Sequence, residues 1–466
     1  MNKSSKNVGI VREREREREV HFKQIKEKRG ITLIALVVTI VVLLILAGIT
    51  INMLFSNGGI FKTAQDAANA WNEATVNEQE SLNNIADQIA NLVNGQIGGG
   101  SGTEEPEDPT TGPNGKLLVD TITEIQTENN LEAEDKYGNL VVVPKGFKVV
   151  TSEGTTVPEG IVIEDINGNQ FVWIPVGTVH KDNKPENDVT IKLGRYTFNT
   201  TNGTPTMQQA AFAGDNPSSP EQTYENEVAI ESYYRELTTY RPGTVDNSNH
   251  LNDLNATAKN LAGFVQSVAD NGGYYLARYE ASYGSGYNSV GSTDAEKYAN
   301  AKPLSKVSTA NSTSSMTYDT PGKLWNYITQ LNASKVSQNM YAGDSSVGVE
   351  SDLVNSYAWD TAIVFIQNMK AENSNYANAG RDETENSSLM NTGATGDKVC
   401  NIFDMAANLL EWTTEYSTNT NSSRAYPCIV RGGGYDYNIL YTANRNYDDA
   451  IDNGSIIGFR VSLYIK

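Results

Sequence analysis

Hydrophobic residues are distributed very unevenly along the 466 residues of this chain. Residues 31–54 form a near-continuous apolar run that contains no charged residue. As a helix with a rise of about 1.5 Å per residue, this run would extend about 36 Å, which is enough to cross the apolar core of a bilayer. The pattern therefore predicts a transmembrane helix over residues 31–54.

Apolar residues return at helical spacing after this run, over residues 60–71 and 82–93. The stripe fits either a juxtamembrane amphipathic helix or the outer part of a stem helix that packs against neighbouring subunits. Residues 96–115 are then rich in Gly, Pro and acidic residues. Such a composition predicts a flexible, extended linker.

Beyond residue 115 the pattern changes to short strand-like runs separated by Gly, Asn, Asp and Pro, as at residues 140–143, 160–163 and 171–174. The clearest helical pattern covers residues 358–366. Long polar stretches between 180 and 260 and between 280 and 350 are typical of surface loops. We expect an α+β head beyond residue 115, which begins with a β-rich lead-in over 116–164.

Charge divides the chain in the same way as hydrophobicity. The net charge is −20, but residues 1–30 alone carry +5, which leaves 26 basic and 51 acidic residues in the remainder. Basic residues beside a membrane helix stay in the cytoplasm, so we expect the head to lie outside the cell. An acidic head argues against nucleic acid as a partner, because phosphate binding needs a basic surface.

Cysteine and histidine are scarce, with only Cys400, Cys428, His21, His180 and His250 in the chain. This set supplies neither a Cys/His zinc site nor a Ser/His/Asp triad. In an exported chain we expect the two cysteines to form a disulfide. The alternative is a pair of buried thiols.

The apolar run follows directly on Lys28, Arg29 and Gly30, with no Ala-x-Ala site after it. This junction resembles the type IV prepilin signal of Gram-positive, clostridial type. The resemblance implies a leader over residues 1–30, cleavage between Gly30 and Ile31 by a prepilin peptidase, and a transmembrane and stem helix over 31–95. Most such pilins have Glu at the fifth mature position, where this chain has Ala35. The signal thus supports anchoring more than assembly with other pilin subunits.

The head resembles the formylglycine-generating enzyme (sulfatase-modifying factor) family, which has a C-type-lectin-like fold. The motifs that carry the resemblance occur in the family's order at residues 171–177, 273–280, 354–362, 401–412, 431–435 and 457–461. Together they imply a C-type-lectin-like domain over residues 165–466.

The family's oxidase chemistry needs two cysteines just after the Gly-Gly motif, which bind copper. Here Tyr437 and Thr442 stand at those positions, and neither supplies a thiolate. The resemblance therefore implies that this chain is not an oxidase. We expect no copper, zinc or nucleotide cofactor.

The segment around Asp404 and Glu411 resembles the part of the family that wraps a calcium ion. The resemblance implies ligands from these two carboxylates and from the carbonyls of Ala407 and Leu409, all hard oxygen donors. The family's usual Gly is Ala at position 407. The alternative is that Asp404 caps a turn and Glu411 pairs with an arginine.

Residues 435–455 consist mainly of Tyr, Asn, Asp, Ile, Thr and Ser. Tyr and Asn combine rigid contact area with adaptable hydrogen bonding, as in recognition loops. The stretch also resembles the variable region of diversity-generating retroelement target proteins; the alternative is an ordinary polar loop. The candidate ligand-binding residues are Tyr435, Tyr437, Asn438, Tyr441, Asn444, Asn446 and Tyr447. We expect Arg445 to support the fold and Arg460 to be buried and hydrogen-bonded.

These observations predict a non-enzymatic, pilin-like cell-surface protein. Residues 31–54 would anchor it in the membrane, and its lectin-like head would bind an extracellular protein or glycan. One alternative is a structural pilus subunit with a decorative head. Another is a membrane-tethered enzyme of the sulfatase-modifying factor family with an altered active site.

Overall fold

The computed structural model describes residues 110–208, 234–236, 258–309, 320–380, 388–417, 428–436, 440–449 and 452–466. All described residues belong to one unit of the chain, Pro106–Lys466. The predicted leader and the predicted transmembrane and stem helix lie outside the described residues. Within the described ranges, no helix is long and apolar enough to span a bilayer.

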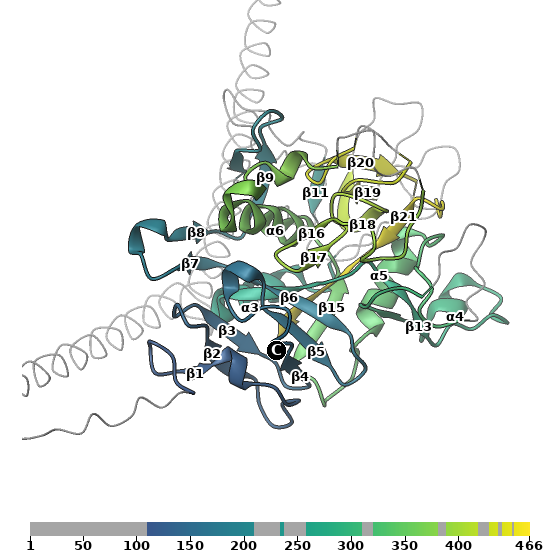
Figure 1. The fold of residues 1–466 in the computed structure, drawn as a ribbon. Coiled ribbons are helices and arrows are strands. Elements are labelled where there is room, and N and C mark those ends of the chain that lie inside the picture. The colour runs from purple at the N-terminus through teal and green to yellow at the C-terminus, as the bar shows by residue number, and fades with distance from the viewer. Residues whose placement is uncertain are drawn as a thin grey trace, which may run out of the picture. The chain divides into compact units, whose positions relative to one another are not determined.

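A six-stranded antiparallel sheet forms the centre of the head (Figure 1). Its order is β15-β22-β12-β6-β5-β4, so the C-terminal strand lies between two strands that are almost 80 residues apart. The strands are β4 (Phe147–Val149), β5 (Val162–Asp165), β6 (Gln170–Pro175), β12 (Gly273–Ala277), β15 (Val349–Leu353) and β22 (Val461–Ile465). Because β4 and β5 belong to this sheet, the predicted lead-in is part of the head.

A second sheet carries the C-terminal motifs. Its order is β11-β18-β19-β20, and β21 pairs with β18 in parallel. The strands are β11 (Tyr234–Glu236), β18 (Leu410–Ser417), β19 (Cys428–Arg431), β20 (Arg445–Asp448) and β21 (Ile457–Phe459).

Smaller sheets complete the β structure. A three-stranded sheet holds β1 (Leu117–Leu118), β2 (Leu131–Glu134) and β3 (Leu140–Val143). The two-stranded pairs are β7 (Gly177–Val179) with β8 (Val189–Ile191), β9 (Arg195–Phe198) with β10 (Pro205–Gln208), β13 (Ser282–Ser285) with β14 (Lys302–Leu304), and β16 (Lys398–Val399) with β17 (Ile402–Phe403). Thr111 also pairs with Leu117, so the end of the predicted flexible linker is an ordered turn.

Two hairpin turns share one design, Asp-x-x-Gly-Asn. Oδ1 of Asp135 accepts hydrogen bonds from the backbone two and four residues later, at 2.9 and 3.0 Å, and Asp165 does the same at 2.8 Å. The side chains of Asn139 and Asn169 donate back to the respective Asp at 2.9 and 2.8 Å. The glycine before each Asn has a positive φ (84° and 78°), which a side chain would strain. The turns therefore fix the β2–β3 and β5–β6 hairpins.

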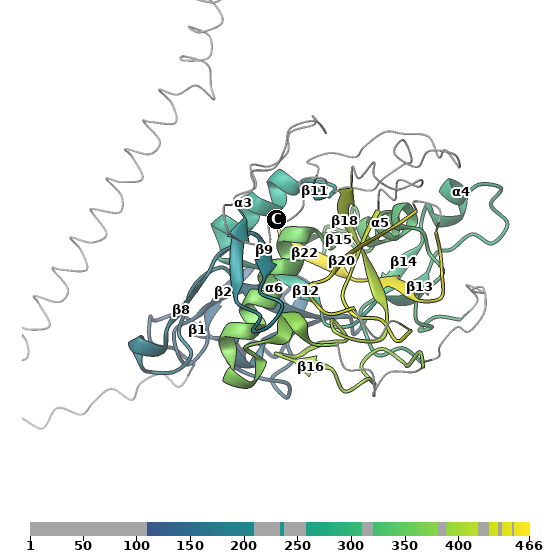
Figure 2. The same ribbon diagram turned by 90° about the horizontal axis from the view of Figure 1, so that it is seen from above.

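The helices among the described residues are α3 (Leu261–Asn271), α4 (Asp294–Tyr298), α5 (Gln330–Asn339) and α6 (Ser356–Met369). Side-chain caps begin them, and Asn355, for example, accepts from the backbone N–H of Ala358 at 2.9 Å. Short 3₁₀ turns lie at Val119–Thr121, Val157–Glu159, Pro185–Asn187, Ala371–Asn373 and Tyr376–Asn378. Helix α6 contacts β6 of the central sheet and β18 of the second sheet, so it lies where the two sheets meet (Figure 2).

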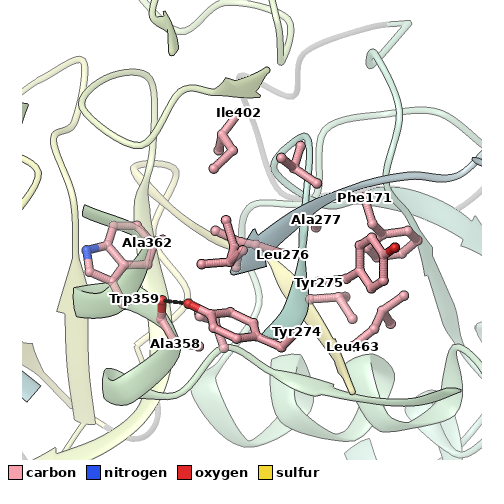
Figure 3. Close-up of a cluster of buried hydrophobic side chains, with 14 of the residues drawn as sticks. Phe171, Tyr274, Tyr275, Leu276, Ala277, Ala358, Trp359, Ala362, Ile402 and Leu463 are labelled. Carbon is pink, nitrogen blue, oxygen red and sulfur yellow. Dashed lines mark hydrogen bonds between the residues drawn. The ribbon is translucent and has the colours of Figure 1, made fainter. Parts of the chain in front are cut away.

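The core is built on this junction (Figure 3). Leu276 and Trp359 are fully buried, and the hydroxyl of Tyr274 donates to the carbonyl of Ala358 in α6 at 2.5 Å. The structure thus confirms the predicted helix over 358–366 and the predicted strands at 140–143 and 171–174, while β5 begins two residues later than predicted. The α+β prediction is confirmed in its coarser form, because the described head is mostly β with few helices.

Candidate functional site

The candidate site is the C-terminal stretch, residues 432–456, and its first part packs on the loop before β18. A Cβ atom at Gly433 would lie 2.1 Å from the carbonyl oxygen of Ala406, so only glycine fits there. The N–H of Gly433 donates to Met405 at 3.3 Å, and that of Tyr435 donates to Asn408 at 2.9 Å. The Gly-Gly motif therefore fixes the point at which the stretch leaves β19.

The middle of the stretch is held by α6 and the turn after it. The backbone N–H groups of Thr442 and Ala443 donate to the carbonyls of Ala379 and Ala377 at 3.1 and 3.0 Å. The indole N–H of Trp359 donates to the carbonyl of Thr442 at 2.9 Å. Residues 441–444 are thus anchored through their main chain.

A buried network of five charged side chains lies beneath the stretch. Glu415 accepts from Arg195, from Arg431 at 3.4 Å and from Arg445 at 2.9 Å. Asp360 accepts from Arg431 at 2.5 Å and also from Arg445. Four of these side chains are fully buried, and that of Arg445 is 9% exposed.

Five elements supply the network: β9, α6, β18, β19 and β20. In the β19–β20 register, Arg431 and Arg445 lie directly opposite each other, which brings both guanidinium groups to Asp360. Like charges in direct opposition repel unless carboxylates separate them. Burial opposes ionisation of Glu415, but Arg445, Arg195 and Arg431 outweigh it and lower its pKa to about 2.

Four of the candidate ligand-binding residues fall in described positions with described side chains. Tyr435, Tyr441, Asn444 and Asn446 are all half-buried, so each is anchored and still presents surface. Tyr437 and Asn438 lie outside the described residues, and Tyr447 is described only as part of β20. That these residues form a ligand-binding surface, and which ligand they would bind, stay predictions.

Arg445 supports the fold, as predicted, through Glu415 and Asp360. Asp448, at the end of the same strand, has a carboxyl pKa raised to about 7 by burial, and the neighbouring Asp452 and Asp449 add to the shift. Arg445 is the sole basic residue between 432 and 456. Because its charge is turned inward, the charge displayed by the described part of the stretch is acidic.

The two carboxylates predicted to bind calcium, Asp404 and Glu411, have partners within the protein. Asp404, which has a φ of 62°, accepts hydrogen bonds from Thr392 at 3.1 Å and from the backbone of Gly393 and the hydroxyl of Thr395 at 2.5 Å. Burial raises the pKa of its carboxyl. Asp404 therefore caps a turn, which is the alternative given by the sequence.

Glu411 likewise follows the alternative. Its carboxylate forms a two-point ion pair with Arg460, which is fully buried and hydrogen-bonded as predicted. The N–H of Leu409 donates to Glu280 at 2.9 Å. In the described parts of the chain, no group of three or more His, Cys, Asp or Glu side chains is placed to hold a metal ion. The two carboxylates are thus held by protein donors, and a calcium ion bound with the carbonyls of Ala407 and Leu409 stays a prediction.

The predicted disulfide is wrong. Cys400 and Cys428 are both buried and are not joined by a disulfide. The thiol of Cys400 faces the carbonyl of Pro158 at 3.7 Å, whereas that of Cys428 faces Gln330 of α5 at 3.2 Å, so the two point toward different elements. Burial raises the pKa of the Cys400 thiol to about 12, which makes it a poor nucleophile.

Sequence reasoning missed Asp360, Glu415, Arg195 and Arg431 as members of one cluster. The available signal was local: Glu415 and Glu411 are charged residues inside a strand whose other residues are apolar or neutral, and Asp360 lies within the apolar pattern of α6. A buried charge in such a pattern predicts an opposite charge beside it. The identity of the partners depends on the fold.

Comparison with known proteins gives a class for this region. A family model described as "Sulfatase-modifying factor enzyme 1-like domain" matches residues 289–464. This part of the chain thus carries a domain of the sulfatase-modifying factor type, as its motifs predicted. No curated protein matches the chain.

Two solved structures are similar to part of the chain. "Crystal Structure of CarF" is 14% identical, with a TM-score of 0.24, and the match covers 30% of this chain and 67% of that one. "Treponema denticola variable protein 1" is 13% identical, with a TM-score of 0.22, and the match covers 41% of this chain and 95% of that one. Similarities of this size support no conclusion about this chain.

Proposed function

We propose that the head is a non-enzymatic recognition domain whose ligand-binding surface is the C-terminal stretch. The observation that carries the proposal is the half-buried state of Tyr435, Tyr441, Asn444 and Asn446 on a main chain that the core holds in place. Fixed aromatic and amide side chains lose little conformational entropy on binding. Such a surface is suited to an extracellular protein or glycan.

A binding array tests this proposal. The full chain, in detergent, is applied to printed arrays of glycans and of immobilised extracellular proteins. We expect the wild type to bind a defined subset, and a variant with all four residues changed to Ala to lose at least tenfold in affinity while its Tm stays within about 2 °C. Replacement of the exposed Val290 by Ala is the matched control. An absence of binding by the wild type, or equal binding by the fourfold variant, would reject the proposal in favour of a decorative head.

The absence of oxidase chemistry is also a proposal. It is supported by Tyr437 and Thr442 at the positions where the family has cysteines, and by the burial of Cys400 and Cys428. The test is incubation of the full chain with copper and a cysteine-containing sulfatase peptide. We expect the mass of the peptide to stay unchanged, whereas conversion of its cysteine to formylglycine would show an enzyme.

We further propose that residues 31–54 anchor the protein in the membrane with the head at the cell surface, after cleavage of the leader. The support is the apolar run and its junction with Gly30 and Ile31. Mass spectrometry of the protein from the cell surface tests this directly. A mature N-terminus other than Ile31 would contradict the cleavage.

A further inference from the structure

Arg445 has an unusual position, because it belongs to the recognition stretch and yet its side chain enters the core. Its Nε donates to the two oxygens of Glu415 at 2.9 and 3.2 Å. Its Nη2 donates to Asp360, and its Nη1 donates to the carbonyl of Tyr196 at 3.3 Å. One side chain of β20 is thus bound to β18, α6 and β9.

The direction of Arg445 sets the direction of its neighbours. Successive side chains of a strand point to opposite faces, so Asn446 points away from the network that Arg445 enters. A slip of one residue in the β19–β20 register would bury Asn446 and expose the charge. The slip would lose the ion pairs of Arg445 with Asp360 and Glu415 and would bury the amide of Asn446 in their place, so the network disfavours it.

The network would remain paired without Arg445. Glu415 would keep Arg195 and Arg431, and Asp360 would keep Arg431 and the backbone N–H of Tyr196 at 2.9 Å. Arg445 is therefore not needed to satisfy the carboxylates of the core. What its contacts add is the attachment of β20.

We propose that Arg445 is a positioning residue for ligand recognition: it fixes β20 so that Asn444 and Asn446 are presented in one orientation. The proposal rests on the proposed function of the stretch. In this proposal Arg445 is a fixed anchor, and the displayed residues, such as Asn444 and Asn446, alone determine which ligand binds. Substitution of displayed residues would then change the ligand and leave the fold intact.

Hydrogen–deuterium exchange of the full chain tests the positioning without any ligand. In the Arg445→Gln variant we expect exchange of residues 440–449 to accelerate at least tenfold, with the central sheet unchanged. Arg445→Lys, which keeps the charge but lacks the planar fork, should restore part of the protection. The matched control is Arg278→Lys, since Arg278 is also buried and pairs with Glu153 instead. That control should leave residues 440–449 as protected as in the wild type.

Two results would overturn the inference. One is unchanged protection of residues 440–449 in Arg445→Gln; the other is an equal loss of protection across the whole head, which would show a general structural role. If Arg445→Gln does not fold, hydrogen–deuterium exchange of Arg445→Lys is compared with that of the wild type, and the same two results would overturn the inference. On the glycan and protein arrays, Arg445→Lys should weaken binding at least fivefold at unchanged Tm. If residues 440–449 exchange faster in Arg445→Gln but the wild type binds nothing on the arrays, the proposed function is rejected. The positioning of β20 by Arg445 then still stands.

Discussion

The guanidinium of Arg460 and the carboxylate of Glu411 form a two-point ion pair in the buried centre of the head. Nε of Arg460 donates to Oε2 at 2.6 Å, and Nη2 donates to Oε1. The same arginine donates to the carbonyls of Ala277 and Phe403 at 3.1 and 2.9 Å. The pair therefore joins β12, β17, β18 and the chain between β21 and β22.

Breaking this pair should be strongly destabilising. Both side chains are 0% exposed, so Glu411→Gln would leave the arginine buried without its carboxylate. We expect the free energy of unfolding to fall by about 3–5 kcal/mol, measured by urea denaturation of the full chain. The control is Lys148→Met, which removes the partly exposed pair with Glu164 and should cost at most about 1 kcal/mol. Equal losses in the two variants would contradict the role given to burial.

Glu415 should make the head sensitive to acid. Its pKa is lowered to about 2 in the folded protein, against about 4.3 in an unfolded chain. Glu415 therefore contributes about 3 kcal/mol to the free energy of unfolding above about pH 4.3. This contribution is lost as the pH falls toward 2. Titration of stability in wild type and Glu415→Gln checks this, and the difference between them should shrink as the pH falls through that window. A constant difference would refute the assignment.

Asp448 should have the opposite effect. Its pKa is raised to about 7, so between about pH 4 and pH 7 the folded state holds a proton that the unfolded chain releases. Stability from this group thus decreases as the pH rises, and the penalty is complete above pH 7. We expect Asp448→Asn to stabilise the head by about 1 kcal/mol at pH 8, discounted for solvent screening, and by nothing at pH 4. Asp436→Asn, at an exposed position of the same stretch, is the control.

Calcium should have little effect on the head. Asp404 and Glu411 are already bound by protein donors, so an ion would have to displace Thr392, Thr395 or Arg460. We expect the head to have the same Tm in about 5 mM EDTA as in about 5 mM Ca²⁺. A saturable rise of several degrees with Ca²⁺, and none with Mg²⁺, would show that the loop rearranges to bind the ion.

The pattern of hydrophobic residues predicted elements whose side chains form the core. Helix α6 was visible because nearly every residue from Ser356 to Met369 is buried and the apolar side chains follow the helical period. Helix α5 was missed within a stretch interpreted as loop, because its burial involves polar residues such as Gln330, which donates to the carbonyl of Thr413 at 2.6 Å. Hydrophobic periodicity does not reveal a helix whose buried side chains are polar and hydrogen-bonded.

The candidate site was predictable in composition and not in geometry. The Tyr and Asn content of residues 435–455 indicated recognition, and Arg445 was correctly assigned to the fold. Its partners Asp360 and Glu415 are 85 and 30 residues away in the chain, and only the packing of α6 on β18 brings them together. The disulfide prediction failed for the same reason: it rested on the expected export of the chain, whereas the fold places the thiols of Cys400 and Cys428 against different elements.

The place of β22 in the central sheet also determines when the head can fold. This strand, Val461–Ile465, pairs with β12 on one side and with β15 on the other. During synthesis, β12 and β15 therefore emerge before the strand that joins them, and their unpaired edges are exposed to aggregation until that strand arrives. Completion of the central sheet therefore depends on Val461–Ile465, which is synthesised last of its six strands.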